Sequence, residues 1–233
     1  MKPGRSRKSK TRTMNPPDLQ HPGVWRELFG PAMRLMAHLE TQVADPKWTF
    51  GGGTVLMLRI GHRQSKDIDL FIPDPQMLGY INPRLSDEAE ALSTDYEENA
   101  EFIKFYLPGG EIDVVVGTAL TANPFDEVVH DGRKLRVETC AEIVAKKLWH
   151  RGDRGTVRDL FDLCAVANAE PGAIEQAAPF FARHGATFLE RLGERANIAR
   201  QEFAAIDALR FTQTFDDCLA QAHVLLKPHL GAR

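Results

Sequence analysis

Residues 50–71 read Phe-Gly-Gly-Gly-Thr-Val-Leu-Met-Leu-Arg-Ile-Gly-His-Arg-Gln-Ser-Lys-Asp-Ile-Asp-Leu-Phe and join a glycine turn, an apolar helical run and two close carboxylates. Side chains of a strand alternate between faces, so Asp67 and Asp69 share one face while Ile68 and Leu70 occupy the other. Two such acids repel unless something neutralises them, and Mg²⁺ does so readily when a phosphate completes its oxygen ligands. The stretch therefore predicts a nucleotide site.

The glycine turn supplies the other half of this prediction. Gly52 and Gly53 allow a ligand to approach the backbone closely and accept positive φ, and Thr54 is a suitable N-cap for the apolar run that follows. A helix that begins here would offer free N–H groups to a phosphate. Taken alone, the glycines could form an ordinary surface turn before a helix, and the two Asp could lie on a solvated strand. Together they favour a site.

A β-hairpin downstream offers a third carboxylate. Residues 101–107 and 111–116 are β-rich runs on either side of Pro108-Gly-Gly, a pattern typical of a hairpin. Ile112 and Val114 share one face and Asp113 lies on the other. An acid is costly to bury there unless it is paired or binds metal. Asp113 is therefore either part of the site or an edge-strand acid that faces water.

A helix with two adjacent lysines follows the sheet-forming part. Thr139-Cys-Ala-Glu142 has the capping-box pattern that predicts a helix start. Lys146 lies four residues after Glu142 and can form an ordinary exposed pair with it, whereas Lys147 has no such partner. Lys147 is therefore the better site candidate.

Three of these motifs together resemble a known family. Residues 52–54 and 63–71 resemble the first motif of the AbiEii/AbiGii toxin family of nucleotidyltransferases, a branch of the DNA polymerase β-like superfamily. The lysine helix and residues 158–163, Arg-Asp-Leu-Phe-Asp-Leu, resemble its later motifs. Thr54 stands where many superfamily members have Ser, which keeps the hydroxyl. An ion pair between Arg158 and Asp162 on the helix surface is the alternative for the last motif.

The resemblance implies the role of each candidate residue. Members of the superfamily hold metal on a nucleoside triphosphate with two Asp, so Mg²⁺ or Mn²⁺ is the expected cofactor and an NTP the expected substrate. The expected nucleotide contacts are Gly52, Gly53, Thr54, Arg63 and Ser65; the expected metal ligands are Asp67, Asp69 and Asp113, and these three with Lys147 and Asp159 are the expected catalytic residues.

The implied reaction moves NMP from an NTP to an acceptor hydroxyl and releases pyrophosphate. Family members are associated with toxin–antitoxin systems and some modify tRNA 3′ ends, so the resemblance implies an RNA acceptor and makes an antitoxin a candidate partner. Two alternatives remain: an enzyme of the same fold that modifies a small molecule, and a nucleotide-binding interaction protein without transfer activity. A P-loop kinase is excluded because the sequence lacks Gly-x-x-x-x-Gly-Lys-Ser/Thr.

The order of elements predicts an α+β fold, with a mixed sheet and flanking helices followed by a helical C-terminal region. We expect a disordered basic leader over residues 1–20, a nucleotidyltransferase core over 21–138 and a helical domain over 139–233. Within the core we expect a helix at 24–43, an acidic helical stretch at 86–99 and a second hairpin formed by 125–129 and 134–137.

Composition limits the class of protein. The 233 residues are 43% hydrophobic and 26% charged, which is typical of a globular chain of one large or two modest domains. No apolar run is long enough for a membrane span, and no apolar segment after the basic start indicates a secretory signal. Cys140, Cys164 and Cys218 lack metal-site spacing and are expected to be reduced, packed thiols of a cytoplasmic protein. His62 is expected to be structural.

Charge is distributed unevenly along the chain. The first thirteen residues hold six basic and no acidic side chains, although the whole chain has a net charge of −3. Such a segment could attract RNA, and a solvated segment without function is an equal alternative. The acidic remainder disfavours tight nonspecific binding to duplex DNA. It still leaves room for a local basic groove that contains Lys147, Arg151, Arg154 and Arg158.

Overall fold

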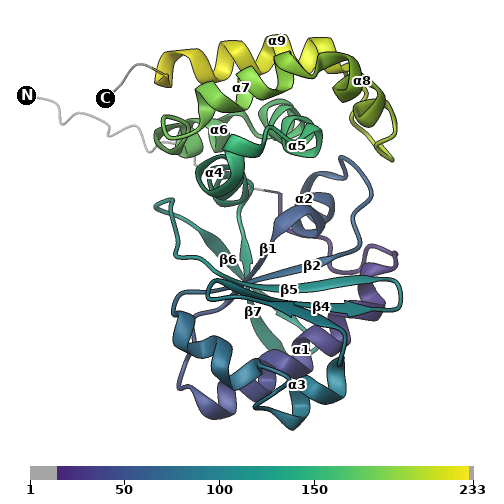
Figure 1. Cartoon of the computed structure of the whole chain (residues 1–233), viewed down its shortest axis with the longest axis vertical. Helices are drawn as coiled ribbons and strands as arrows, with labels where there is room; N and C mark the ends of the chain where they lie inside the picture. Colours follow the sequence, from purple (N-terminus) through teal and green to yellow (C-terminus); the bar gives the residue numbers. More distant parts are fainter. Residues whose placement is uncertain (1–14, 231–233) are drawn as a thin grey trace, which may run out of the picture.

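The computed structural model describes residues 15–230, in which a seven-stranded sheet lies between helices on its two faces (Figure 1). The strand order is β3-β4-β5-β2-β1-β7-β6. The pairs β2–β5 and β1–β7 are parallel and the others antiparallel, so the predicted mixed sheet is confirmed. The strands are β1 (Thr49–Gly51), β2 (Ile68–Ile72), β3 (Tyr96–Glu98), β4 (Phe102–Leu107), β5 (Gly110–Val116), β6 (Phe125–His130) and β7 (Arg133–Glu138).

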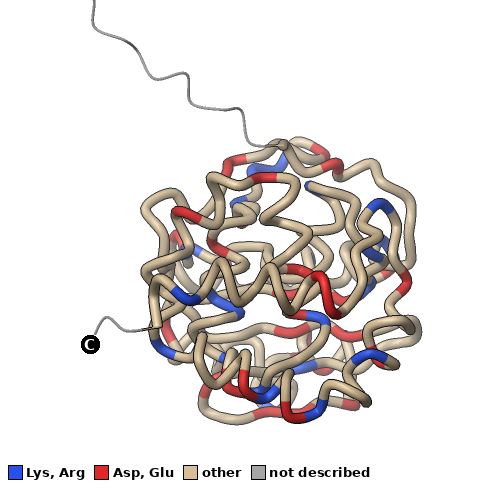
Figure 2. The backbone as a smooth tube through the Cα atoms, turned by 90° about the horizontal axis from the view of Figure 1, so that it is seen from above, with Lys and Arg blue, Asp and Glu red and all other residues tan. Residues whose placement is uncertain are grey.

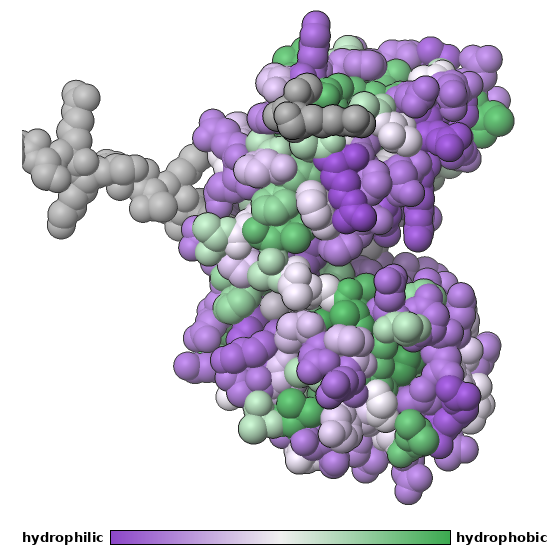
Figure 3. Space-filling model, turned by 60° about the vertical axis from the view of Figure 1, so that its left-hand side comes forward, coloured by the Kyte–Doolittle hydropathy of each residue, from purple (hydrophilic) through white to green (hydrophobic). Residues whose placement is uncertain are grey.

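Different helices cover the two faces of the sheet. One face carries α1 (Trp25–Gln42), the 3-10 helix η1 (Pro75–Ile81) and α3 (Asp87–Leu92), whereas α2 (Gly52–Ile60) and the C-terminal helices lie on the other (Figure 1). The surface narrows between the C-terminal helices and the sheet-containing part (Figure 3). The C-terminal helices are α4 (Cys140–Arg151), η2 (Gly152–Arg154), α5 (Val157–Ala169), α6 (Pro171–Ala177), η3 (Ala178–Phe180), α7 (Gly185–Glu194), α8 (Ala196–Ala204), α9 (Phe215–Leu226) and η4 (Lys227–His229).

Alternation of side chains along the two central parallel strands separates the core from the site. Ile68 and Leu70 of β2 and Ile112 and Val114 of β5 are completely buried. The helix α1 packs against both strands. The acidic side chains at the intervening positions therefore project from the opposite face, as the sequence predicts.

The predicted helix at 24–43 and both predicted hairpins are confirmed by α1, β4–β5 and β6–β7. The acidic helix expected at 86–99 is wrong in its second half, because α3 ends at Leu92 and Tyr96 pairs with Phe105 across β3 and β4. The Ser93 hydroxyl donates to the backbone carbonyls of Asp95 and Tyr106, which fixes the chain in its turn away from the helix.

The start of α2 differs from the prediction at one position. The N-cap is Gly51, so Thr54 lies inside the first turn and the prediction of Thr54 as the cap is wrong. Its side chain is completely buried. The Thr54 hydroxyl donates 2.6 Å to the carbonyl of Asp67, and it thereby fixes the segment just before β2.

The basic residues of the predicted leader lie outside the described residues, but its last part does not. Leu19 is buried in the core and the N–H of Asp18 donates to the carbonyl of Leu58. The expectation of disorder up to residue 20 is therefore wrong for residues 15–20. At the other boundary, β7 ends at Glu138 and α4 begins at Cys140, yet buried apolar side chains from both sides form one cluster. The division into two domains stays a prediction.

Two further expectations concern the chain as a whole. All three cysteines are buried and free, as expected for packed thiols. Within residues 15–230, no helix combines the length and the apolar character that crossing a membrane requires.

Arg59 joins α2 to the sheet and to the N-terminal segment. Its side chain is buried, and its guanidinium donates to the carbonyls of Glu138 at 2.8 Å, Val137 at 3.0 Å and Asn15 at 2.8 Å. It also pairs with Asp126 at 2.8 Å. One side chain thus satisfies three backbone acceptors on two separate segments.

We expect Arg59→Met to lower the free energy of unfolding by about 3 kcal/mol, because three carbonyls lose their donor. In a chain of this size that loss lowers the Tm by roughly 6–12 °C. Asp126→Asn is the matched control, because the Asp126 side chain is 40% exposed and a pair of that kind contributes less than about 1 kcal/mol. Thermal denaturation of both variants measures the difference. Equal losses would show that Arg59 stabilises the fold mainly through Asp126.

Candidate active site

Two carboxylates lie side by side on the face of the sheet that carries α2 (Figure 1). Asp69 and Asp113 are register partners on the parallel strands β2 and β5, so their half-buried side chains project from the same face. Asp67 directly precedes β2, and its Oδ1 accepts the backbone N–H of Glu111 at 3.1 Å. The fold therefore brings together all three acids that the sequence singles out.

The glycine turn lies directly against Asp69. Gly52 has φ +73°, and a Cβ at this position would lie 1.8 Å from Asp69 Oδ2. A Cβ on Gly53 would lie 2.9 Å from both Ser65 Oγ and Arg63 Nη2. Only glycine therefore fits at residue 52, and the N-terminus of α2 faces the same space as the carboxylates.

The nearby cations do not offset the cost of burying these acids. Burial raises the pKa of Asp69, although Arg151 and Lys147 act in the opposite direction. Burial and then the charge of Asp69 raise the pKa of Asp113 to about 7, against the effect of Lys104. Asp113 Oδ1 is buried and has no hydrogen-bond partner among the described residues. An added cation would relieve both effects.

Lys104 belongs to this site although it is absent from the predicted set. It is the register partner of Asp113 across β4 and β5, and its Nζ lies 2.6 Å from Glu111 Oε2 and 3.4 Å from Asp113 Oδ2. The predicted hairpin was sufficient to place Lys104 opposite Asp113. With Pro108 and Gly109 as the two turn residues, residues 104 and 113 face each other.

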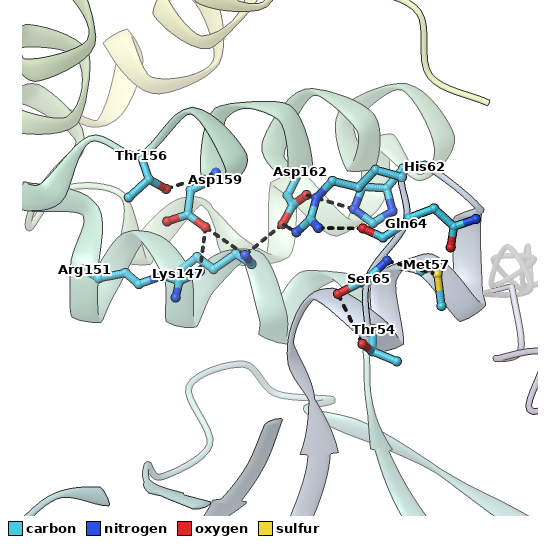
Figure 4. A network of polar contacts seen from close by, with 11 residues as sticks. Thr54, Met57, His62, Gln64, Ser65, Lys147, Arg151, Thr156, Asp159 and Asp162 are labelled. Carbon is cyan, nitrogen blue, oxygen red and sulfur yellow. Dashed lines mark hydrogen bonds and ion pairs between the residues drawn. The ribbon is translucent and has the colours of Figure 1, made fainter. Parts of the chain in front are cut away.

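A buried carboxylate organises the cations above the glycine turn (Figure 4). Asp162 of α5 is completely buried. It accepts from His62 Nε2 at 2.8 Å, Arg63 Nε at 2.7 Å and Lys147 Nζ at 2.7 Å. Burial would raise the pKa of Asp162, but Lys147 and Arg63 hold it well below its ordinary value. His62 is buried in this network.

Asp159, one turn earlier on α5, continues the network toward the cleft. Its Oδ1 accepts from Lys147 Nζ and from Arg151 Nη2, both at 2.7 Å. Burial would raise the pKa of Asp159, but Lys147 and Arg151 lower it to about 2. Lys147 is therefore held between two carboxylates, and Arg151 extends from the end of α4 with a buried Nε that has no partner in the described part of the chain.

Two expectations about these helices are wrong, and a third is incomplete. Lys147 has no partner at helical spacing on α4, as expected, but it pairs with Asp159 and Asp162 of α5. Lys146 is buried rather than exposed, and its Nζ lies 2.6 Å from Glu138 Oε1 but 3.7 Å from Glu142. The alternative surface pair of Asp162 with Arg158 is also absent from the described ion pairs. Helical spacing identified neighbours along one helix, but the partners came from other elements.

The segment after α2 is also tied to the linker between α8 and α9. Arg63 and Ala208 form an isolated antiparallel bridge. The N–H of Gln64 donates to Asp207, and the N–H of Leu209 donates to His62. The position of Arg63 thus depends on residues far along the chain as well as on Asp162.

These elements enclose a cleft of about 1040 Å³ between the sheet and the C-terminal helices. Acidic and basic residues are interspersed over the molecule (Figure 2), and both kinds line the cleft. Its acidic lining residues are Asp67, Asp69, Glu111, Asp113, Glu202 and Asp207; its basic ones are Arg63, Lys66, Lys104, Lys147, Arg151, Arg158 and Arg195.

The donor set of the cleft suits a hard cation. Carboxylate oxygens are ligands that Mg²⁺ prefers, and Asp113 Oδ1 is free to bind one. Within residues 15–230, however, no three His, Cys, Asp or Glu side chains are already arranged to hold a metal ion. A cation here would need further oxygens, such as those of a triphosphate.

Comparison with known proteins identifies the family. Residues 34–226 match the family model described as nucleotidyl transferase AbiEii toxin, type IV toxin–antitoxin system. The chain therefore belongs to the AbiEii toxin family, and it is a nucleotidyltransferase. The resemblance seen in the sequence is confirmed. A search of curated proteins gave no match.

Three solved structures are similar over most of their length. A Helicobacter pylori protein provisionally named a nucleotidyltransferase has 15% identity and a TM-score of 0.47, with 88% of this chain and 95% of that chain covered. JHP933 from Helicobacter pylori has 15% identity and a TM-score of 0.45, covering 85% and 90%. The STING-associated CdnE c-di-GMP synthase from Capnocytophaga granulosa has 11% identity and a TM-score of 0.31, covering 89% and 80%.

The raised pKa of Asp113 predicts a pH-dependent gain in stability on its removal. Because the pKa is about 7 in the folded protein and about 3.9 in the unfolded chain, ionisation of Asp113 destabilises the fold as pH rises from about 4 to 7. We expect Asp113→Asn to raise the free energy of unfolding at pH 8 by an amount on the order of 1–3 kcal/mol, which raises the Tm by a few degrees. The gain should vanish near pH 4.

Thermal denaturation in EDTA at pH 4 and pH 8 measures this gain without bound metal. Asp95→Asn is the control, because it removes the same charge from an exposed position. A gain in both variants would indicate a general effect of net charge. If the Tm of Asp113→Asn at pH 8 is no higher than that of the wild type, ionisation of Asp113 does not destabilise the fold.

Proposed function

We propose that the chain catalyses metal-dependent transfer of NMP from an NTP to a hydroxyl of RNA. The carrying observation is the register pairing of Asp69 with Asp113 beside the N-terminus of α2. This arrangement places carboxylates for a cation and a helix N-terminus for a phosphate in one cleft. The family supports nucleotidyl transfer, whereas the metal and the RNA acceptor are our proposals.

The carboxylates have separate roles in this proposal. Asp67 and Asp69 hold the metal that accompanies the triphosphate, and Asp113 completes the set. Mg²⁺ or Mn²⁺ bound there would neutralise phosphate charge and polarise the reacting phosphoryl group. Asp113 has a second role, because its Oδ1 has no partner among the described residues and a carboxylate at that place can accept the proton of the acceptor hydroxyl.

The nucleotide lies against the glycine turn. The backbone of Gly52 and Gly53 and the hydroxyl of Ser65 contact phosphate oxygens, because Ser65 Oγ borders the space above Gly53. Thr54 is assigned a positioning role, since its hydroxyl donates to the backbone carbonyl of Asp67. Arg63 donates to Asp162 through Nε and Nη2, so only its remaining N–H groups can reach the nucleotide.

Two cations oppose the carboxylates across the cleft. Lys147 and Arg151 both act on the pKa of Asp69, so their charges are felt at the metal-binding face. We assign them to the negative charge that develops on the leaving group, which preorganised cations stabilise. Asp159 contacts both of them and is their positioning residue.

The reaction follows from these roles. The acceptor hydroxyl oxygen bonds to the α-phosphorus, the bond from that phosphorus to the β-phosphate bridging oxygen breaks, and pyrophosphate leaves. The hydroxyl proton passes to Asp113.

The proposal of an RNA acceptor is supported by charge at the mouth of the cleft. Lys66, Arg158 and Arg195 line it, and Arg158 is exposed and has no ion-pair partner in the described part of the chain. Cations at this position suit a phosphate backbone. An antitoxin partner and a cytoplasmic location are proposed from the family and the composition alone.

Labelled nucleotides test the reaction. The protein is incubated with total RNA, Mg²⁺ and each NTP carrying ³²P at either the α or the γ phosphate. We expect RNA to acquire the α label and not the γ label. Transfer of the γ label would indicate a kinase, label on a small molecule would identify the alternative acceptor class, and the absence of any product would favour nucleotide binding without transfer.

Asp69→Asn should abolish transfer without unfolding the protein. We expect the rate to fall by at least roughly 10²–10³-fold, the range seen when a preorganised electrostatic group is lost, and the Tm not to fall, because the substitution removes a carboxylate that is costly to ionise there. Transfer assays and thermal denaturation on the same preparation measure both. Substantial activity in the folded variant would remove Asp69 from the mechanism.

Arg158→Glu should weaken RNA use but not NTP binding. We expect the KM for RNA to rise several-fold and the salt slope of RNA binding to decrease by about 0.7–0.9 for each phosphate that is no longer neutralised. Arg34→Glu is the matched control, because Arg34 is exposed on α1, which covers the opposite face of the sheet. Equal effects of both substitutions would attribute the change to net charge and not to the cleft.

A further inference from the structure

A lysine already lies where the proposed metal site needs positive charge. Asp67, Asp69 and Asp113 all line the cleft, but within residues 15–230 only Asp113 of these three forms an ion pair, and its partner is Lys104. Asp113 Oδ2 faces the ammonium at 3.4 Å, while Oδ1 has no partner. The two oxygens of one carboxylate are thus in different environments.

The backbone holds Lys104 at this place. Residues 104 and 113 are direct partners in the β4–β5 hairpin, so their side chains project from the same face at close range. Glu111, two residues before Asp113 on the same face, holds Lys104 Nζ at 2.6 Å. The lysine side chain is only 25% exposed. Its ammonium group therefore lies between two carboxylates inside the cleft.

A second divalent ion at Asp113 would have to share this space with the ammonium. Two-metal sites place their ions about 3.5–4 Å apart, and both ions need carboxylate charge to offset their repulsion. Here Glu111 and one oxygen of Asp113 already neutralise Lys104. The remaining unpaired acids, Asp67 and Asp69, suffice for one divalent ion that also binds the triphosphate.

We propose that Lys104 takes the place of one of the two divalent ions of a two-metal site, so that the chain binds one divalent ion together with the nucleotide. This inference rests on the metal-dependent transfer proposed above. In this arrangement the Lys104 ammonium supplies the positive charge beside the acceptor hydroxyl that a second metal ion would otherwise supply. Asp113 Oδ1 is then left free to receive the acceptor proton.

The competing interpretation is a lysine that swings aside when metal binds. In that case Lys104 only pairs with Asp113 before the ions arrive, and the loaded site holds two ions. The two interpretations differ in the number of ions bound to the wild-type protein, and this number can be measured without any turnover.

The test counts Mn²⁺ by electron paramagnetic resonance of the free ion. The full chain, freed of metal by EDTA and dialysis, is titrated with Mn²⁺ at a saturating concentration of an NTP analogue with an α,β-methylene bridge. After excess ion and analogue have been removed by rapid gel filtration, the Mn²⁺ that acid releases from the protein should amount to one ion per chain. Two ions would overturn the inference and leave the proposed function intact, whereas no bound ion would overturn the proposed metal dependence itself.

Substitution of the lysine tests its part directly. We expect Lys104→Met to bind two Mn²⁺ per chain under the same conditions, because Asp113 and Glu111 lose their cation. Lys134→Met is the matched control and should still bind one, since Lys134 lies on the other hairpin and pairs with Glu127 at 3.7 Å. A Lys104→Met variant that is folded by circular dichroism and binds one ion would overturn the inference. Should it fail to fold, the wild-type count decides.

Discussion

The buried carboxylate of Asp162 is the contact on which the arrangement of the active site depends. It is completely buried and accepts from His62, Arg63 and Lys147, which come from two separate stretches of the chain. A buried charge is stable only when its partners surround it. The segment after α2 and the lysine of α4 are therefore held in place by a residue that does not itself line the cleft.

This network and the metal-binding face have opposite charge balance. Around Asp159 and Asp162 the cations lower both pKa values, so that part of the structure is stabilised by ionisation. At Asp69 and Asp113 burial raises the pKa values, so ionisation there has a cost in the free protein. A site that binds a cation and a nucleotide shows this imbalance before its ligands arrive, and ligand binding then offsets the cost.

The local pattern of the sequence was sufficient for the sheet and for its acids. The alternation of apolar and acidic residues predicted which side chains of β2 and β5 share a face, and the hairpin pattern identified Asp113 as the third acid. Both signals depend on residues only a few positions apart. The partners of Lys147 and Asp162, and the nearest partner of Lys146, could not be found in this way. They are contributed by other elements, and helix spacing describes only neighbours on the same helix.

The bridge between Arg63 and Ala208 has a consequence for the synthesis of the protein. Arg63 is also joined to Asp162 across 99 residues of sequence, and contacts between such distant segments form late because the intervening chain must first be closed into a loop. Most of the chain must therefore be synthesised before the segment after the glycine turn can form these contacts. The candidate active site therefore becomes complete only after the C-terminal helices have been synthesised.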